Sequence, residues 1–343
     1  MATQKTWQLV YDRFGDPDKV LYELEVNVSP ELARDELRVR WLAASVNPSD
    51  LSQVRGVYPI NKKFPVVGGN EGVGVVEQMG ESVRGINIGD HVIPFACQLG
   101  TWQSRTIVST TDVIVIDKKL PTEIGAQMLI NPPTAYRMLH DFVQLQPNDI
   151  VVQNGANSAV GRYVIQIARL CGWRTVNIIR QRDDVDQQRA LVAELRALGA
   201  DLVVTDAEFK AKTAETLQPL GAKPKLAFDC VGGPICAVMA ACLQPDGHFV
   251  NYGAMSHQPV AISPADLIFR NITVHGFWLS GSSVAKVTRQ EHERTYKWLT
   301  DQFLRGKLVG PPTDQVEYKN WQQAIAVANK GSGNKQLIQF NDC

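Results

Sequence analysis

The pattern of apolar and polar positions gives the first part of the chain a β-rich character. In ELRVRWLAA (residues 36–44), Leu37, Val39 and Trp41 alternate with polar or small neighbours. Alternation with a period of two is typical of strands that bury one face. Glycine-bounded runs of the same kind cover residues 72–80, 89–96 and 106–116. The pattern predicts an irregular antiparallel domain over about the first 125 residues.

After Pro132 the pattern changes to strand-like runs that alternate with helical spacing. The strand-like runs are residues 149–154, 174–180, 201–206, 225–230, 248–253 and 272–278. Helical spacing covers residues 134–145, 160–171, 185–198 and 234–243. This alternation predicts right-handed βαβ crossovers and therefore an α/β fold with a doubly wound parallel sheet.

The last part of the chain returns to helical spacing, at residues 289–305 and 319–330, and ends on the strand-like run QLIQF. An isolated strand would leave its backbone groups unpaired, so this run is expected to join the N-terminal domain. We therefore expect a discontinuous domain built from residues 1–128 and 280–343, and a doubly wound domain over residues 129–279.

Composition narrows the classes of function. Lys plus Arg and Asp plus Glu each number 35, so the formal net charge is zero. Neither nucleic-acid binding nor membrane association is indicated, because there is no basic excess and no membrane-length apolar run. The six cysteines form no C-x-x-C pair, and we interpret them as buried thiols in a reducing compartment. No signal or transit peptide is visible, which favours the cytoplasm unless an import segment is missing.

The stretch VVQNGANSAVGRYVIQIARL (residues 151–170) joins a strand-like run to a helical one through small residues. The dinucleotide fingerprint G-x-G-x-x-G would fall on Ala156, Ser158 and Gly161, so only its third glycine is present. Alanine and serine are small enough for a slightly wider approach to a pyrophosphate, and the helix N-terminus offers free N–H groups. Spacing alone leaves a bare turn and a dinucleotide site equally supported.

The end of the next strand-like run favours the dinucleotide site. The segment Arg180-Gln181-Arg182 begins nineteen residues after Gly161, where an NAD-binding protein would place an acid on the ribose hydroxyls. Arginine can instead hold a 2′-phosphate through paired N–H bonds. A solvated basic turn is the alternative, but the position within a βαβ unit predicts NADPH as the cofactor.

Nine segments taken together resemble the mitochondrial 2-enoyl thioester reductase family of the medium-chain dehydrogenase/reductase superfamily. They are NPSDLSQVRGVYP, FPVVGGNEGVGVV, GTWQSRTIV, NPPTAYRML, QNGANSAVGRYVIQIA, NIIRQR, YGAM, HGFWLS and NKQLIQF, within residues 6–340. The resemblance implies a GroES-like catalytic domain and a Rossmann cofactor domain. It also implies NADPH-dependent reduction of trans-2-enoyl thioesters of coenzyme A or acyl carrier protein, in fatty-acid synthesis in the mitochondrial matrix.

Zinc-dependent members of that superfamily carry metal ligands that this chain lacks. Asn47 stands where the first catalytic ligand would be, Asn70 replaces the histidine ligand, and only Cys97 lies near the structural-zinc region. Zinc needs four donors, or three and a water. We therefore expect no bound metal.

Tyr58, in RGVYPINKKFP, matches the position of the family's catalytic tyrosine. By itself, a tyrosine beside a proline is more often a packed turn residue. The resemblance implies that its phenol donates to the enolate that forms when hydride reaches the β-carbon. The loop after Tyr58 is longer and more basic than is typical of the family.

The resemblance assigns the cofactor contacts residue by residue. Asn131 approaches the nicotinamide; Asn157, Ser158, Ala159 and Val160 form the pyrophosphate turn; Arg180, Gln181 and Arg182 hold the 2′-phosphate; Tyr252, Gly253, Ala254 and Met255 face the ribose; Phe277, Trp278 and Leu279 lie beside the nicotinamide and the acyl entrance; and Lys335 is a late basic contact. For Lys335 a surface lysine is the alternative.

Two other functions stay open: a zinc-free NADPH quinone reductase and a catalytically silent NADPH-binding protein of the zeta-crystallin type. Tyr58 and the segment 277–279 favour the thioester reductase. The family also implies a homodimer that pairs edge strands in ITVHGFWL (residues 272–279).

Several other polar residues are interpreted as structural. His91, His140, His248 and His275 have no partners at catalytic spacing, and Asp229 is a turn acceptor rather than a base.

Overall fold

The computed structural model describes residues 4–59, 63–281, 288–331 and 333–340. The chain divides into two compact units, one comprising Met1–Ile130 and Arg289–Cys343 and the other Asn131–Thr288. The sequence analysis placed the boundaries slightly earlier, after residues 128 and 279.

Two sheets form the first unit. One has the strand order β2-β1-β4, and the other has the order β15-β16-β3-β5-β6-β8, with β7 also paired to β3. Leu37, Val39 and Trp41 of β3 are fully buried, as their alternation predicts. The strands are β1 (Gln4–Tyr11), β2 (Tyr22–Val28), β3 (Glu36–Val46), β4 (Val66–Val67), β5 (Gly72–Met79), β6 (His91–Pro94), β7 (Arg105–Ser109), β8 (Val113–Ile116), β15 (Thr313–Glu317) and β16 (Lys335–Gln339).

The C-terminal strand β16 pairs antiparallel with β3, with Gln336 opposite Val46 and Gln339 opposite Ala43. This pairing confirms that the run QLIQF returns to the N-terminal part of the chain. It also carries Lys335 to the end of β3, next to the start of α2.

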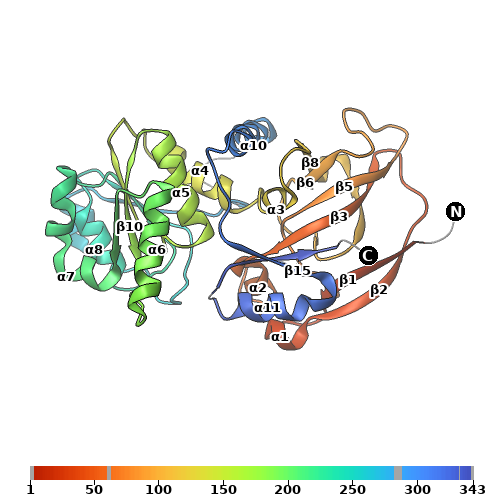
Figure 1. Ribbon diagram of the computed structural model, residues 1–343, viewed down its shortest axis with the longest axis horizontal. Helices are drawn as coiled ribbons and strands as arrows, with labels where there is room; N and C mark the ends of the chain where they lie inside the picture. The colour runs from red at the N-terminus through yellow and green to blue at the C-terminus, as the bar shows by residue number, and fades with distance from the viewer. Residues whose placement is uncertain (1–3, 60–62, 282–287, 332, 341–343) are drawn as a thin grey trace. The chain divides into compact units, whose positions relative to one another are not determined.

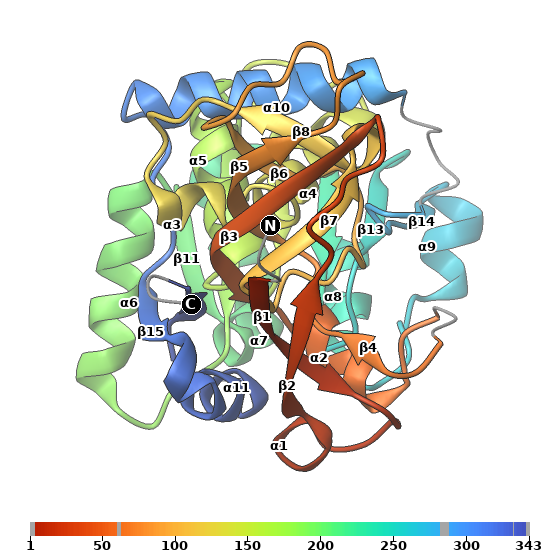
Figure 2. The same ribbon diagram turned by 90° about the vertical axis from the view of Figure 1, so that its right-hand side faces the viewer.

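The N-terminal part of the first unit contains three short helices that its β-rich sequence does not predict, whereas its two C-terminal helices lie where helical spacing predicts them. The helices of this unit are α1 (Pro17–Val20), α2 (Pro48–Arg55), α3 (Thr122–Gly125), α10 (Arg289–Leu304) and α11 (Trp321–Asn329), with short 3₁₀ turns at Thr110–Asp112 and Tyr318–Asn320. In Figure 2, α10 runs alongside β8, while α11 lies near α1. Asn47 and Asp50 form a capping box at the start of α2, which satisfies N–H groups that a helix start leaves unpaired.

The second unit contains a parallel sheet with the order β11-β10-β9-β12-β13-β14. Its strands are β9 (Ile150–Gln153), β10 (Arg174–Ile179), β11 (Leu202–Thr205), β12 (Leu226–Asp229), β13 (His248–Asn251) and β14 (Thr273–Gly276). Every pairing is parallel. The chain reverses direction across the sheet between β9 and β12, so the predicted doubly wound sheet is confirmed and its switch point lies beside β9.

Helices cover both faces of this sheet. They are α4 (Asn131–Asp141), α5 (Ala159–Leu170), α6 (Val185–Leu198), α7 (Asp206–Leu217), α8 (Ile235–Cys242) and α9 (Pro264–Phe269), with a 3₁₀ turn at Gln218–Leu220. Figure 1 shows α5 and α6 on one side of β10 and α7 and α8 on the other. The sequence analysis missed α7, because Phe209 is its only buried residue and no apolar face marks the helix.

No helix among the described residues is both long enough and apolar enough to cross a membrane.

Candidate functional site

The turn between β9 and α5 has the close packing that a dinucleotide site requires. Ser158 caps α5, and its hydroxyl accepts a hydrogen bond from the Gly161 N–H at 3.1 Å. A Cβ on Gly161 would lie 2.6 Å from the carbonyl oxygen of Ala156, so only glycine lets the helix approach this turn. The surviving third glycine therefore keeps its packing role, while Ala156, fully buried, replaces the first.

A buried side-chain network ties together the strand ends around the switch point. One carboxylate oxygen of Asp229 accepts from the Asn154 side chain and from the N–H groups of Val231 and Gly232, both at 3.0 Å. The other accepts from the Asn251 amide at 2.7 Å. These contacts confirm Asp229 as a turn acceptor. Asn154 and Asn251, which follow β9 and end β13, were not predicted because their role depends on strands distant in sequence.

Arg162 stabilises the turn from inside α5. Its Nε donates to the carbonyl of Asn157 at 3.0 Å, and its guanidinium forms a two-point ion pair with Glu194 of α6. The Arg162 side chain is largely shielded from solvent, whereas that of Glu194 is partly exposed. Arg162 therefore holds Asn157, a predicted pyrophosphate contact, in place; sequence reasoning missed this arginine because it reads as an ordinary helix residue.

Arg180, Gln181 and Arg182 directly follow β10, as predicted. The backbone there is ordered by hydrogen bonds from the Gln181 N–H to Asp206 at 3.0 Å and from the Arg182 N–H to Gln188 at 3.1 Å. Across the described part of the chain, neither guanidinium group takes part in a hydrogen bond or an ion pair. Two cations on an ordered turn are thus available to an anionic ligand.

The other predicted cofactor residues follow β13 and β14. Tyr252 begins the segment after β13, and its N–H donates to the Asp229 carbonyl at 2.9 Å. Burial raises the pKa of the Tyr252 phenol well above its usual value. Phe277, buried after β14, donates its N–H to the Asn251 carbonyl at 2.8 Å, whereas Trp278 is partly exposed.

The structure therefore gathers most of the predicted cofactor residues at one edge of the second unit. The segments 157–160, 180–182, 252–255 and 277–279 all follow the carboxyl ends of parallel strands, and such ends meet at the same edge of a sheet. Asn131 is the first residue of α4 and is buried.

Some of the structural interpretations need correction. His248 and His275 do have a partner, since their ring nitrogens Nδ1 and Nε2 lie 2.9 Å apart, and burial lowers both pKa values. Cys97 and Cys171 are only half-buried, whereas Cys230, Cys236 and Cys242 are buried as expected. Cys343 lies outside the described residues.

Tyr58 belongs to the first unit and stands two residues after Gly56, which ends α2. Gly56 adopts a left-handed conformation with φ of 77°, and a Cβ there would lie 2.6 Å from Cγ of Phe14. The tyrosine itself is partly exposed. The basic loop that the sequence analysis noted includes residues 60–62, which lie outside the described residues.

The positions of the absent zinc ligands are occupied by hydrogen-bonded amides. The Asn47 side chain donates to Glu71 Oε1 at 2.7 Å, and Asn70 Oδ1 accepts from Gln53 Nε2 at 2.9 Å. Asn70 also donates to the carboxylate of Asp50. Asn47, Asp50, Asn70 and Glu71 are all buried. Sequence reasoning identified the two asparagines but missed their partners.

Lys335 completes this buried cluster. Its Nζ donates to the Asn47 amide oxygen and to the Val46 carbonyl at 3.1 Å, and it lies 3.7 Å from Glu71 Oε1. Burial lowers the pKa of Lys335, an effect that Glu71 and Asp50 oppose. Burial also raises the pKa of Asp50 to about 7, although its hydrogen bonds and Lys335 act in the other direction.

This donor set does not suit zinc. The side-chain amide of Asn47 is hydrogen-bonded to Glu71, and that of Asn70 to Gln53. The ammonium group of Lys335 donates to the amide oxygen of Asn47. Among the described residues, no three His, Cys, Asp or Glu side chains are grouped as metal ligands. Zinc sites in proteins use thiolate, imidazole and carboxylate donors.

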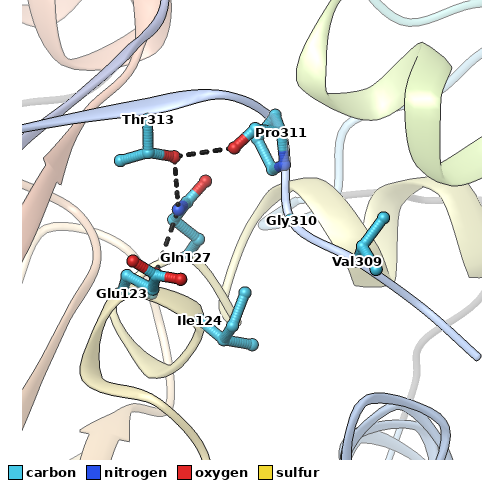
Figure 3. Close-up of a pocket in the computed structure, with 7 residues that line it drawn as sticks. All are labelled: Glu123, Ile124, Gln127, Val309, Gly310, Pro311 and Thr313. Carbon is cyan, nitrogen blue, oxygen red and sulfur yellow. Dashed lines mark hydrogen bonds between the residues drawn. The ribbon is translucent and has the colours of Figure 1, made fainter. Parts of the chain in front are cut away.

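A separate pocket of about 340 Å³ lies in the first unit between α3 and the segment before β15. Gln127 lines it and donates to the Glu123 carbonyl at 3.0 Å and to the Thr313 hydroxyl at 3.3 Å (Figure 3). None of the sequence-predicted site residues lines this pocket.

Two family models match separate parts of the chain. The model for the alcohol dehydrogenase GroES-like domain matches residues 33–118, and the model for zinc-binding dehydrogenases matches residues 159–294.

Solved structures resemble the whole chain. A complex of Etr1p with NADP and crotonyl-CoA superposes with a TM-score of 0.90 at 31% identity, covering 98% of this chain and 100% of that one. The Etr1p/Etr2p heterodimer of Candida tropicalis, a mitochondrial 2-enoyl thioester reductase, gives the same TM-score, identity and coverage of this chain. A putative NADPH:quinone reductase from Bacillus thuringiensis has a TM-score of 0.87 at 26% identity, over 98% of this chain and 100% of its own.

Among curated proteins, the mitochondrial enoyl-[acyl-carrier-protein] reductase of Caenorhabditis elegans is 43% identical over 304 residues, which are 88% of this chain and 86% of that protein. The human reductase of the same name is 39% identical over 94% of this chain and 85% of its own length. The resemblance seen in the motifs thus extends over nearly the whole chain, which belongs to the mitochondrial enoyl-[acyl-carrier-protein] reductase family.

Proposed function

We propose that this protein reduces trans-2-enoyl thioesters of coenzyme A or acyl carrier protein to saturated acyl thioesters, with NADPH as the reductant. The proposal is carried by Arg180 and Arg182, which lie on an ordered turn that follows β10. Their guanidinium groups make no hydrogen bond or ion pair with any described residue. The neighbouring turn after β9 has the tight packing of a dinucleotide site. The proposal also draws on the relatives, which are named as enoyl-[acyl-carrier-protein] reductases, and on Etr1p, whose complex holds NADP and crotonyl-CoA.

Residues of the second unit would hold the cofactor. The free N–H groups at the start of α5 and the turn at Asn157 and Ser158 suit a pyrophosphate. Arg180 and Arg182 suit a 2′-phosphate, and the segments after β13 and β14 suit the ribose and the nicotinamide. Bound there, NADPH supplies the hydride that the β-carbon of the substrate receives.

Tyr58 is the proposed proton donor. Hydride arriving at the β-carbon moves the electron pair of the double bond toward the thioester carbonyl, so negative charge develops on the enolate. A phenol keeps its proton at neutral pH, and Tyr58 can pass that proton to the α-carbon as the enolate collapses. One hydride and one proton account for the two hydrogens of the saturated product.

This function predicts a substrate preference that a simple assay can measure. Oxidation of NADPH should saturate with a trans-2-enoyl-CoA, with kcat/KM in the range of about 10⁴–10⁸ M⁻¹ s⁻¹. A saturated acyl-CoA of the same chain length is the matched control and should give no turnover.

A quinone in the same assay tests the second candidate function, which the Bacillus thuringiensis relative favours. Quinone reduction without enoyl-CoA reduction would assign the protein to that activity. Tight NADPH binding without turnover of either substrate would instead indicate a catalytically silent protein.

The described surface supports a homodimer through the edge of the parallel sheet. β14 is the terminal strand of that sheet, and Val274 on it is exposed. Beside it in sequence, α9 exposes Ile268 to 69% and Phe269 to 82%. An open strand edge with adjoining apolar side chains suits pairing with a second copy, and the related Etr1p/Etr2p is a heterodimer.

Phe269→Asp should therefore weaken self-association at least about tenfold, because an aromatic anchor at an interface commonly contributes 2 kcal/mol or more. Sedimentation velocity across a dilution series measures this change. Ile88→Asp is the matched control, since Ile88 is an exposed apolar residue of the other unit. A native protein that is monomeric, or a Phe269→Asp variant that associates like the native protein, would contradict the proposed interface.

The relatives are named as mitochondrial proteins. We infer that this protein acts in mitochondria, in the matrix, where fatty-acid synthesis on acyl carrier protein would supply its substrate.

A further inference from the structure

Asn70 lies at the centre of the buried polar cluster in the first unit. Only 1% of its surface is exposed to solvent. Its Nδ2 donates to Asp50, while its Oδ1 accepts from Gln53 Nε2 at 2.9 Å and from the Gln98 N–H at 3.0 Å. One amide therefore makes three hydrogen bonds where the zinc-dependent relatives have a histidine ligand.

Two of these three partners belong to α2. Asp50 and Gln53 are three residues apart and therefore lie on the same face of the helix, and both are buried. The third partner, the Gln98 backbone, belongs to a different loop and anchors the amide from the other side. α2 cannot shift or rotate against Asn70 without leaving buried polar groups unpaired, which is costly.

The position of Tyr58 depends on the position of α2. The helix ends at Arg55, Gly56 turns the chain in a left-handed conformation against Phe14, and only Val57 separates that turn from Tyr58. A displacement of the helix is thus passed to the tyrosine through a short, sterically defined connection.

We propose that Asn70 is a positioning residue for Tyr58, acting through Asp50 and Gln53 of α2. The proposal rests on the proposed catalytic role of Tyr58. The Asn70 amide then fixes the position of α2 by hydrogen bonds, at the place where a zinc-dependent enzyme of the superfamily has a metal ligand. Asn70 itself would contact neither substrate nor cofactor.

The test is Asn70→Leu, which keeps similar volume and removes all three hydrogen bonds. With crotonyl-CoA and NADPH, kcat should fall about 10- to 100-fold, because small misplacements of a catalytic group have effects of this size. The KM for NADPH should stay close to native, because none of the three hydrogen-bond partners of Asn70 is a predicted cofactor residue. A KM for NADPH that rises in proportion to the loss of kcat would contradict a positioning role.

The same substitution in a Tyr58→Phe background separates positioning from general damage. If Asn70 acts through Tyr58, the second substitution should change kcat by less than about twofold, since coupled residues are not additive. Equal losses in the two backgrounds would overturn the positioning role alone. A native kcat in Tyr58→Phe itself would overturn both the proposed proton donor and this inference.

Two further variants complete the design. Gln53→Met removes one of the three hydrogen bonds and should give a smaller loss of the same kind, and it decides the question if Asn70→Leu does not fold. Gln127→Leu is the matched control, because Gln127 is an equally buried amide of the same unit whose hydrogen bonds go to Glu123 and Thr313. It should keep a native kcat; a loss equal to that of Asn70→Leu would overturn the proposal.

Discussion

Tyr58→Phe is expected to lower kcat for a short trans-2-enoyl-CoA by about 10²–10³-fold, the usual result of deleting one donor that acts on a developing oxyanion. The phenylalanine keeps the ring, its packing and the turn after Gly56. It loses only a contact that strengthens in the transition state, so the KM of the substrate should change little. Stopped-flow turnover measures the effect.

Tyr22→Phe is the matched control for this substitution, since Tyr22 is a partly exposed tyrosine of the same unit, on β2. It should keep the native kcat. A thermal melt of both variants checks that neither unfolds. If Tyr58→Phe keeps a kcat within about threefold of native, smaller than the loss of any essential donor, Tyr58 is a packing residue and the proton comes from elsewhere.

The double substitution Arg180→Ala/Arg182→Ala is expected to remove the preference for NADPH over NADH. Charge-assisted hydrogen bonds to a phosphate contribute about 1.5–3 kcal/mol each, so two of them give a preference of about 10²-fold or more. The free guanidinium groups have no internal partners to lose among the described residues. The substitution should therefore raise the KM for NADPH and leave the KM for NADH nearly unchanged.

Arg196→Ala serves as the control here, because Arg196 is an exposed arginine at the end of α6. It removes one positive charge from the same unit and should preserve the preference. Equal KM values for NADPH and NADH in the native protein would contradict the assignment of the cofactor.

Local patterns predicted the elements that bury apolar residues in a regular way. β9 is buried along its whole length and begins with three apolar residues, so its sequence reads as a strand. The helix α6 was predicted with its observed bounds. α7 has one buried residue and a non-helical Lys212, so periodicity could not reveal it. The capping box of Thr205 and Glu208 was the available signal, since Thr-x-x-Glu marks a helix start.

The sequence by itself determined the features that depend on neighbours along the chain. The turn after β9 and the arginines after β10 lie within one βαβ unit, and Asn47 and Asn70 could be recognised as replacements for metal ligands from their motifs.

Only the tertiary structure decided what those asparagines do. Asn47 meets Lys335 because β16 pairs with β3, across 288 residues of sequence. Asn70 meets Asp50 and Gln53 of α2 and the backbone of Gln98 in a separate loop. Buried amides and charges must find partners wherever the fold supplies them. Periodicity and motif spacing describe single elements, so the partners of a buried polar group become known only once the chain has packed.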